Sequence, residues 1–283
     1  MLRWTGEFWW PFVRILALFA AAPVFSGATV PVPLKVALAA VLAFLVASIV
    51  AQPAPLDLTW RALVLTGEQI LVGLAMGFAM QIALTAMSLA GDFVGVQMGF
   101  GFATLLGVEG NFTVPVMADF FGLIGLVLFL AFNGHLVLIG ALVKSFAVVP
   151  VAVGASIHAA GWAALANSGA MLFEIGVFLA LPVVAVVLTM HLAVGTLSRA
   201  APQVNLMSVG FALFLWVGIA ATVTLVPFFP PAVEHMIEAG LVLIRAAMQA
   251  LEQWRYQPTL LNGEPVAVDM VVTVHFQLGG EPS

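Results

Sequence analysis

The sequence predicts an all-α membrane protein, and three observations carry that prediction. Of the 283 residues, 63% are hydrophobic and only 7% are charged, and the mean hydropathy is +1.18. In a soluble domain, about a quarter of the residues are usually charged. The apolar residues occur in long runs without strand alternation, and backbone in lipid must satisfy its hydrogen bonds within the segment. We therefore expect helices that are covered by lipid or by other apolar subunits.

Long apolar runs follow one another along most of the chain and suggest six or seven helical spans. A span needs roughly 20 helical residues to cross a hydrocarbon core of ~30 Å. The runs are Phe8–Phe25, Val36–Ala51, Ala62–Ala90, Val114–Phe132, Leu136–Gly154, Ile175–Leu197 and Val204–Phe229. The third would be roughly 43 Å long at ~1.5 Å per residue, whereas the second is short. Such segments favour a packed helical assembly over a standard bundle, because irregular backbone is buried against protein.

Composition and motifs argue against several functions. The chain has only eight basic residues, so a nucleic-acid surface is not expected. It has no cysteine, and its five histidines lack metal-ligand spacing, so we expect no metal site. Neither a phosphate-binding glycine loop with lysine nor a nucleophile elbow is present, so we predict neither an enzyme nor a cofactor. Pro11 and Arg14 interrupt the first apolar run, which predicts a retained helix and not a cleaved signal peptide.

The C-terminal part differs in kind from the apolar region. Residues Val233–Leu251 place polar side chains on one helical face and apolar ones on the other, which predicts an amphipathic helix. After Leu251 the composition changes, and Val271–Leu278 alternates like a strand. Asn262-Gly263 is a typical hairpin turn. We therefore predict two domains, residues 1–251 and a short β-hairpin-like tail, residues 252–283.

Glycines four residues apart predict close contacts between helices. Gly73 and Gly77 form one such pair, and Gly91 and Gly95 form another. Small residues at this spacing make a smooth ridge on which a second helix can approach closely. A glycine-rich and largely uncharged loop follows the second pair. It is either an ordinary interhelical turn or a mobile apolar element that could seal a pore.

Ionisable residues inside the apolar runs are candidates for functional contacts, because such groups usually face partners or water. They are Arg14, Lys35, Glu68, Asp92, Asp119, Lys144, Glu174 and Arg199. For Arg14, Lys35 and Arg199 the simplest interpretation is snorkelling near a helix end. We select Glu68, Asp92, Asp119 and Arg199 as candidates for pairing between subunits or for polar lining, with proton relay as the rival role for Glu68 and Asp92.

Five motifs in order resemble the FliR family of export-gate proteins. They are FVRILALFAAAPVF with VPVPLKVALA, EQILVGLAMGFAMQ, GDFVGVQMGFGFAT, VPVMADFFGLIGLVLFLAFNGH and LPVVAVVLTMHLAVGTLSRAAPQVNLMSVGF. The resemblance extends roughly from Phe8 to Leu251. The segment Asn133-Gly134-His135 favours the flagellar branch over the injectisome branch, SctT, which remains the alternative.

The resemblance implies a subunit of the flagellar type III export gate, in the inner membrane at the flagellar basal body. Its fold would consist of long, partly broken helices and helical hairpins. Partners would be FliP-like and FliQ-like subunits, with FlhA-like and FlhB-like proteins nearby, and unfolded flagellar proteins would pass through the shared channel. The resemblance also implies that a loop at about Gly99–Thr113 plugs the closed channel. Its candidate residues are Gly99, Phe100, Gly101, Phe102, Leu105, Leu106, Gly107, Gly110 and Phe112.

Two alternatives stay open. The tail, with WRYQP, LNGEPV and VTVHF, resembles the end of TonB-type C-terminal domains. It is either an acquired docking tail or an artefactual fusion across a gene boundary. For the apolar region, a small-solute secondary transporter is the rival from another class, since polar residues in broken helices could form a binding site. No convincing inverted repeat supports that rival.

Overall fold

The computed structural model describes two compact units, Met1–Glu252 and Gln253–Ser283. The described residues are 2–27, 30–48, 60–100, 115–149, 151, 159–200, 206–252, 260–261 and 264–265. The first unit is helical. Its elements are α1 (Leu2–Ala21), α2 (Val32–Ala47), α3 (Trp60–Gln97), α5 (Val116–Ala131), α6 (Gly134–Val148), α7 (Ala159–Ala200), α8 (Leu206–Leu225), η1 (Val226–Phe228) and α9 (Phe229–Glu252).

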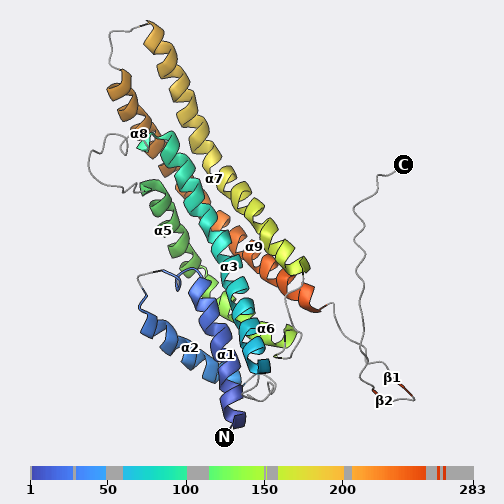
Figure 1. The fold of residues 1–283 in the computed structure, drawn as a ribbon. Helices are drawn as coiled ribbons and strands as arrows, with labels where there is room; N and C mark the ends of the chain where they lie inside the picture. The colour runs from blue at the N-terminus through green and yellow to red at the C-terminus, as the bar shows by residue number, and fades with distance from the viewer. Residues whose placement is uncertain are drawn as a thin grey trace, which may run out of the picture. The chain divides into compact units, whose positions relative to one another are not determined.

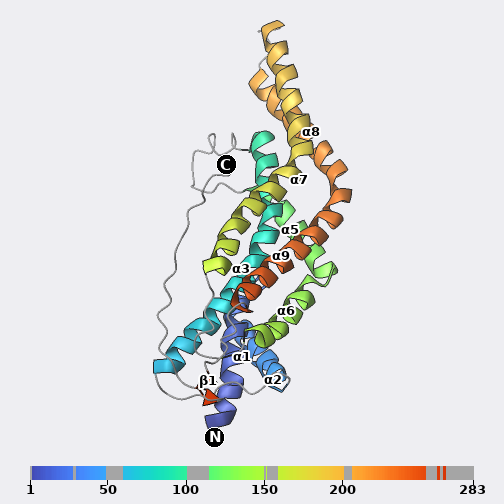
Figure 2. The same cartoon turned by 90° about the vertical axis from the view of Figure 1, so that its right-hand side faces the viewer.

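The long helix α3 is the centre of the first unit. Helices α1, α5, α7 and α9 all pack on it, and α2 packs on α1 (Figures 1 and 2). Helices α7 and α8 pair with each other as a long hairpin that extends beyond the end of α3 (Figure 1). One end of the unit is therefore built around α3, and the other consists mainly of the α7–α8 hairpin.

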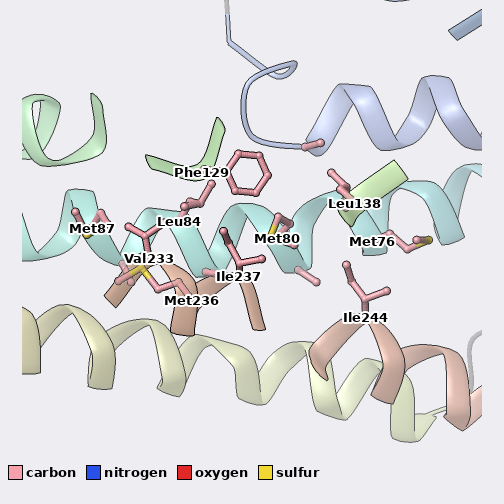
Figure 3. Close-up of a cluster of buried hydrophobic side chains, with 14 of the residues drawn as sticks. Met76, Met80, Leu84, Met87, Phe129, Leu138, Val233, Met236, Ile237 and Ile244 are labelled. Carbon is pink, nitrogen blue, oxygen red and sulfur yellow. The ribbon is translucent and has the colours of Figure 1, made fainter. Parts of the chain in front are cut away.

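Methionines of α3 form much of the core where α9 crosses it. Met76, Met80 and Met87 are buried, and Figure 3 shows them among residues of α9 such as Val233 and Ile237. Methionine is unbranched and polarisable, so it fills irregular gaps between crossing helices. The amphipathic helix expected near the C-terminus is α9, and its apolar side faces this core.

Helices α5 and α6 form a bent pair and not one continuous span. Their axes meet at 65°, and the break lies at Asn133, whose φ is 56° in the left-handed region. Asparagine tolerates that conformation better than most residues. Gly134 follows, and a Cβ built there would collide with the ring of Phe129. The Asn-Gly sequence thus permits both the backbone turn and the close packing at the bend.

The predicted number of spans is wrong. Among the described residues, three helical stretches are long and apolar enough to cross a membrane, or four if the bent α5–α6 pair counts as one span. The three stretches are Ala62–Gln97, Ala166–Arg199 and Gly210–Arg245. Hydropathy overestimated the number because it counted short helices such as α2 and divided the bent pair into two. The fold class, an all-α membrane protein, is confirmed.

The second unit contains a short antiparallel pair in its described part. Strand β1 (Leu260–Leu261) pairs with β2 (Glu264–Pro265), with Leu261 opposite Glu264. The two strands flank Asn262-Gly263, where the sequence predicts a hairpin turn. The alternating stretch Val271–Leu278 lies outside the described residues.

Candidate functional site

The candidate site is the segment between α3 and α5, and α3 contacts α5 directly on its approach to that segment. A Cβ built on Gly91 would overlap the backbone of Met117 and lie 2.7 Å from the Cα of Ala118. A Cβ on Gly95 would lie 3.3 Å from the Cβ of Met117. Only glycine leaves room for α5 at such a distance. The C-terminal end of α3 and the N-terminal end of α5 are therefore held against each other.

The residues that directly follow α3 are also held in place. Met98 is fully buried, and its side chain occupies the space where a Cβ on Gly218 of α8 would lie. Gly99 follows with φ at 86°, a conformation that residues with a Cβ rarely adopt. Phe100 is partly buried and packs against the core. The chain thus leaves α3 through a left-handed glycine next to a methionine that is packed on α8.

Two of the predicted plug residues, Gly99 and Phe100, lie in the described part of the chain. The others lie outside it, and these are Gly101, Phe102, Leu105, Leu106, Gly107, Gly110 and Phe112. What the structure does place are the two ends from which this segment leaves. At the second end, α5 begins after Pro115, whose carbonyl accepts a hydrogen bond from the Asp119 N–H at 2.9 Å.

Gly73 and Gly77 lie at the contact between α3 and α1. A Cβ on Gly73 would lie 2.8 Å from the Cβ of Ala17 and still closer to the carbonyl oxygen of Arg14. A Cβ on Gly77 would lie 2.7 Å from the carbonyl oxygen of Leu18. Both pairs of spaced glycines on α3 thus lie at helix contacts, one pair with α1 and the other with α5.

Arg14 does not snorkel, and this expectation is corrected. Its side chain is fully buried. Nε donates to Gln69 Oε1 at 2.8 Å, Nη1 donates to Ser145 Oγ at 3.0 Å, and Nη2 donates to the Val149 carbonyl at 3.0 Å. The guanidinium also lies 4.1 Å from the ring centre of Phe146, a cation–π contact.

We call Arg14, Gln69 and Ser145 the arginine cluster. It ties three helices together, α1, α3 and α6, through residues that are up to 131 positions apart in the sequence. Sequence reasoning missed this cluster, because the apolar neighbours of Arg14 on its own helix do not reveal which polar groups of other helices will contact Arg14. The signal that could have found it is the position of Arg14 in the middle of an apolar run.

The charged candidates for pairing differ in their exposure. Asp92, Asp119 and Arg199 are exposed on the surface of this chain, whereas Glu68 is half-buried. Glu68 and Asp92 lie several turns apart on α3, Asp119 lies on α5 next to the α3 contact of Ala118, and Arg199 lies at the end of α7. Lys35 is half-buried, and its Nζ donates to the Gly27 carbonyl at 3.2 Å. Among the described residues, no group of three or more His, Cys, Asp or Glu side chains could hold a metal ion.

The described part of the first unit contains a larger and a smaller pocket, among others. The larger, about 910 Å³, lies between α7 and the α8–α9 region and is mainly apolar, with Glu174 and His235 in its lining. The smaller, about 370 Å³, lies between the turn after α1, the middle of α3 and the first part of α5. It is more polar, and Asp119 lines it.

Comparison with known proteins assigns the first unit. Residues 5–240 match the family described as "Bacterial export proteins, family 1". The chain belongs to this family. The FliR-type flagellar biosynthetic protein of Escherichia coli strain K12 is 40% identical over 236 residues, which cover 83% of this chain and 90% of the relative. That of Pectobacterium carotovorum is 39% identical with the same coverage, and that of Bacillus subtilis strain 168 is 29% identical over 71% of this chain and 79% of the relative.

This family membership makes the chain a membrane component of flagellar protein export. Its relatives carry the name of a flagellar biosynthetic protein and not that of an enzyme. A second family, the Gram-negative bacterial TonB protein C-terminal, matches residues 238–278. The two matches overlap at residues 238–240, so the second begins inside α9 and continues through β1 and β2.

Proposed function

We propose that this export protein is the FliR-type subunit of the flagellar type III export gate in the inner membrane. It would assemble with FliP-like and FliQ-like subunits next to FlhA-like and FlhB-like proteins, and unfolded flagellar proteins would pass through their shared channel. Residues 99–113 would plug the closed channel. As part of this proposal, residues 1–251 form the gate domain and residues 252–283 a separate tail.

The observation that carries the plug proposal is the fixed position of both ends of the loop. Gly91 and Gly95 hold the end of α3 against Met117 of α5, and Met98 is packed on Gly218 of α8. An apolar loop with several glycines can move without disturbing the helices only if both of its ends are anchored. These contacts supply the anchors, and the largely apolar side chains between them could exclude water without binding what passes.

The exposed apolar surface supports assembly with other subunits. Phe178 on α7 is 79% exposed, and Trp216 and Val223 on α8 are 72% and 64% exposed. Large apolar side chains that are exposed to this extent usually mark a contact with lipid or with another protein. Partner subunits packed on the α7–α8 hairpin would bury them. The flagellar names of the relatives favour the flagellar gate over the injectisome alternative.

A shortened loop tests the plug. We expect that deletion of residues 103–110 makes the closed gate permeable to small solutes, because it shortens the loop and removes Leu105 and Leu106 while the anchors at Gly91 and Met98 remain. The measurement is solute or ion leakage across membranes of cells that produce the complete gate. The matched control shortens residues 201–205 between α7 and α8, which should leave the gate tight. A tight gate in the loop variant would refute the plug.

A further inference from the structure

The smaller pocket combines hydrogen-bond acceptors with a strained turn. Its volume is about 370 Å³, and its polar lining comes from Gln81, Thr85 and Ser88 of α3, from Asp119 of α5 and from Ser26 in the turn after α1. Val24 lines the opposite side with φ at 73°. A β-branched residue in the left-handed region is a genuine outlier, and such strain gathers at functional sites. We call this pocket the Asp119 notch.

The hydrogen bonds inside the notch leave an acceptor unfilled. The Gln81 amide oxygen is shielded from solvent, yet it has no hydrogen-bond partner among the described residues. The Gln81 amide nitrogen donates to the Thr85 hydroxyl over a long 3.5 Å, and that hydroxyl donates to the Gln81 backbone carbonyl at 2.8 Å. A buried acceptor without a partner is costly, and proteins rarely keep one. Within the described part of the chain, the Gln81 amide oxygen therefore has no donor.

The carboxylate of the notch lies in an apolar surface. Asp119 is exposed, and around it on α5 are Val116, Phe120 and Leu123, which are 46%, 43% and 61% exposed. Asp119 forms no ion pair within the part of the chain that the structure describes. A carboxylate on an apolar membrane helix normally meets an opposite charge or water. The apolar surface around Asp119 is suited to contact with another apolar helix. A basic residue on that helix would neutralise the charge of the Asp119 carboxylate.

We propose that the Asp119 notch receives one basic side chain, arginine or lysine, from a helix of a neighbouring gate subunit. This inference rests on the proposed function. The charge of Asp119 attracts the cation, and the Gln81 oxygen accepts one of its N–H groups. Arginine suits the notch best, because its planar guanidinium offers five donors to acceptors that lie apart. The apolar residues around Asp119 then pack on the same partner helix.

Lys35 is a basic residue of this chain that lies beside the notch, since its Nζ donates a hydrogen bond to the carbonyl of Gly27, which lines the pocket. That hydrogen bond orients Lys35 toward a backbone carbonyl and not toward a carboxylate. The test must still separate it from a partner's cation. The variant Lys35→Gln serves this purpose, because it removes the charge and leaves the helix start of α2 in place.

The first experiment compares complexes of the full chain co-expressed with FliP-like and FliQ-like proteins from the same genome. We expect Asp119→Asn to lower the yield of complex about tenfold or more, since truncation of one member of a buried charge pair is expensive. Asp119→Glu should restore part of it. Glu234→Gln, the same change at an exposed position of α9, and Lys35→Gln should give the wild-type yield.

Each result decides the matter. An unimpaired Asp119→Asn complex, or an equal loss with Lys35→Gln, overturns the notch while the export-gate proposal stands. Absence of any wild-type complex overturns both.

A photoreactive amino acid in place of Leu123 supplies the second measurement. We expect it to cross-link a partner peptide that contains arginine or lysine, and reversal of both charges should restore the complex. Cross-links to lipid alone contradict the proposal.

Discussion

Helix α3 and the α7–α8 hairpin are similarly apolar, but they use their apolar surface differently. In the most apolar window of Ala62–Gln97, 61% of the residues are buried inside this chain, against 28% for Ala166–Arg199 and 17% for Gly210–Arg245. The contacts of α3 depend on glycines and on the arginine cluster. The hairpin carries large exposed side chains such as Trp216. One region has its partners in the same chain, and the other leaves its surface for lipid or neighbouring subunits.

The arginine cluster should give the largest effect on the stability of the α3 region. We expect Arg14→Ala to lower the free energy of unfolding by about 3 kcal/mol or more. The substitution leaves a cavity, and it removes the guanidinium N–H groups that donate to Gln69, Ser145 and the Val149 carbonyl. Denaturant unfolding of the purified chain in mild detergent measures this. Arg14→Met fills most of the space with an apolar chain and should cost much less. Equal losses for both variants would mean that the hydrogen bonds, and not the packing, dominate.

The contact between α3 and α5 should be the next most sensitive. Gly91→Ala should cost about 1–3 kcal/mol, since the added methyl group overlaps the Met117 backbone, which cannot move aside like a flexible side chain. The matched control is Gly195→Ala on α7, where no atom lies within 4 Å of the new Cβ. It should be neutral or stabilising by up to about 1 kcal/mol, as expected for alanine in a helix. Similar losses at both glycines would contradict the contact.

The exposed hairpin should behave in the opposite way. Trp216→Ser should change the unfolding free energy of the isolated chain by less than about 0.5 kcal/mol, because the side chain is 72% exposed. The same variant should weaken the complex with partner subunits at least about fivefold, as expected for a buried aromatic anchor. Titration of the complex by native mass spectrometry measures the second effect. A large loss of stability in the isolated chain would contradict the proposed difference between α3 and the α7–α8 hairpin.

The fold class and most helix positions could be predicted from the sequence. The runs Val114–Phe132 and Val204–Phe229 differ from α5 and α8 by a few residues, because continuous apolar runs give a strong signal. Helix α7 begins at Ala159, well before the predicted run at Ile175, since its first turns contain polar and small residues that lower the hydropathy without breaking the helix. The number of spans was wrong for a related reason, because hydropathy does not distinguish a bent pair from two spans.

The candidate site could be predicted only in part. Spaced glycines such as Gly73 and Gly91 are readable in the sequence, because their spacing matches the helical repeat. The partners of a buried polar group are not, and Arg14 shows why. Its acceptors come from α3 and α6, and nothing near it in the sequence indicates that these helices will enclose it. The sealing role of residues such as Phe102 and Leu105 stays a prediction.

The most direct test of the account is the mass of the complex that forms when the tagged chain is co-expressed with FliP-like and FliQ-like proteins from the same genome. The account predicts a stable complex that contains one copy of this chain together with both partners. In that complex, the partner subunits would cover the exposed surface of the α7–α8 hairpin. A lone monomer or a homodimer that binds neither partner would contradict it.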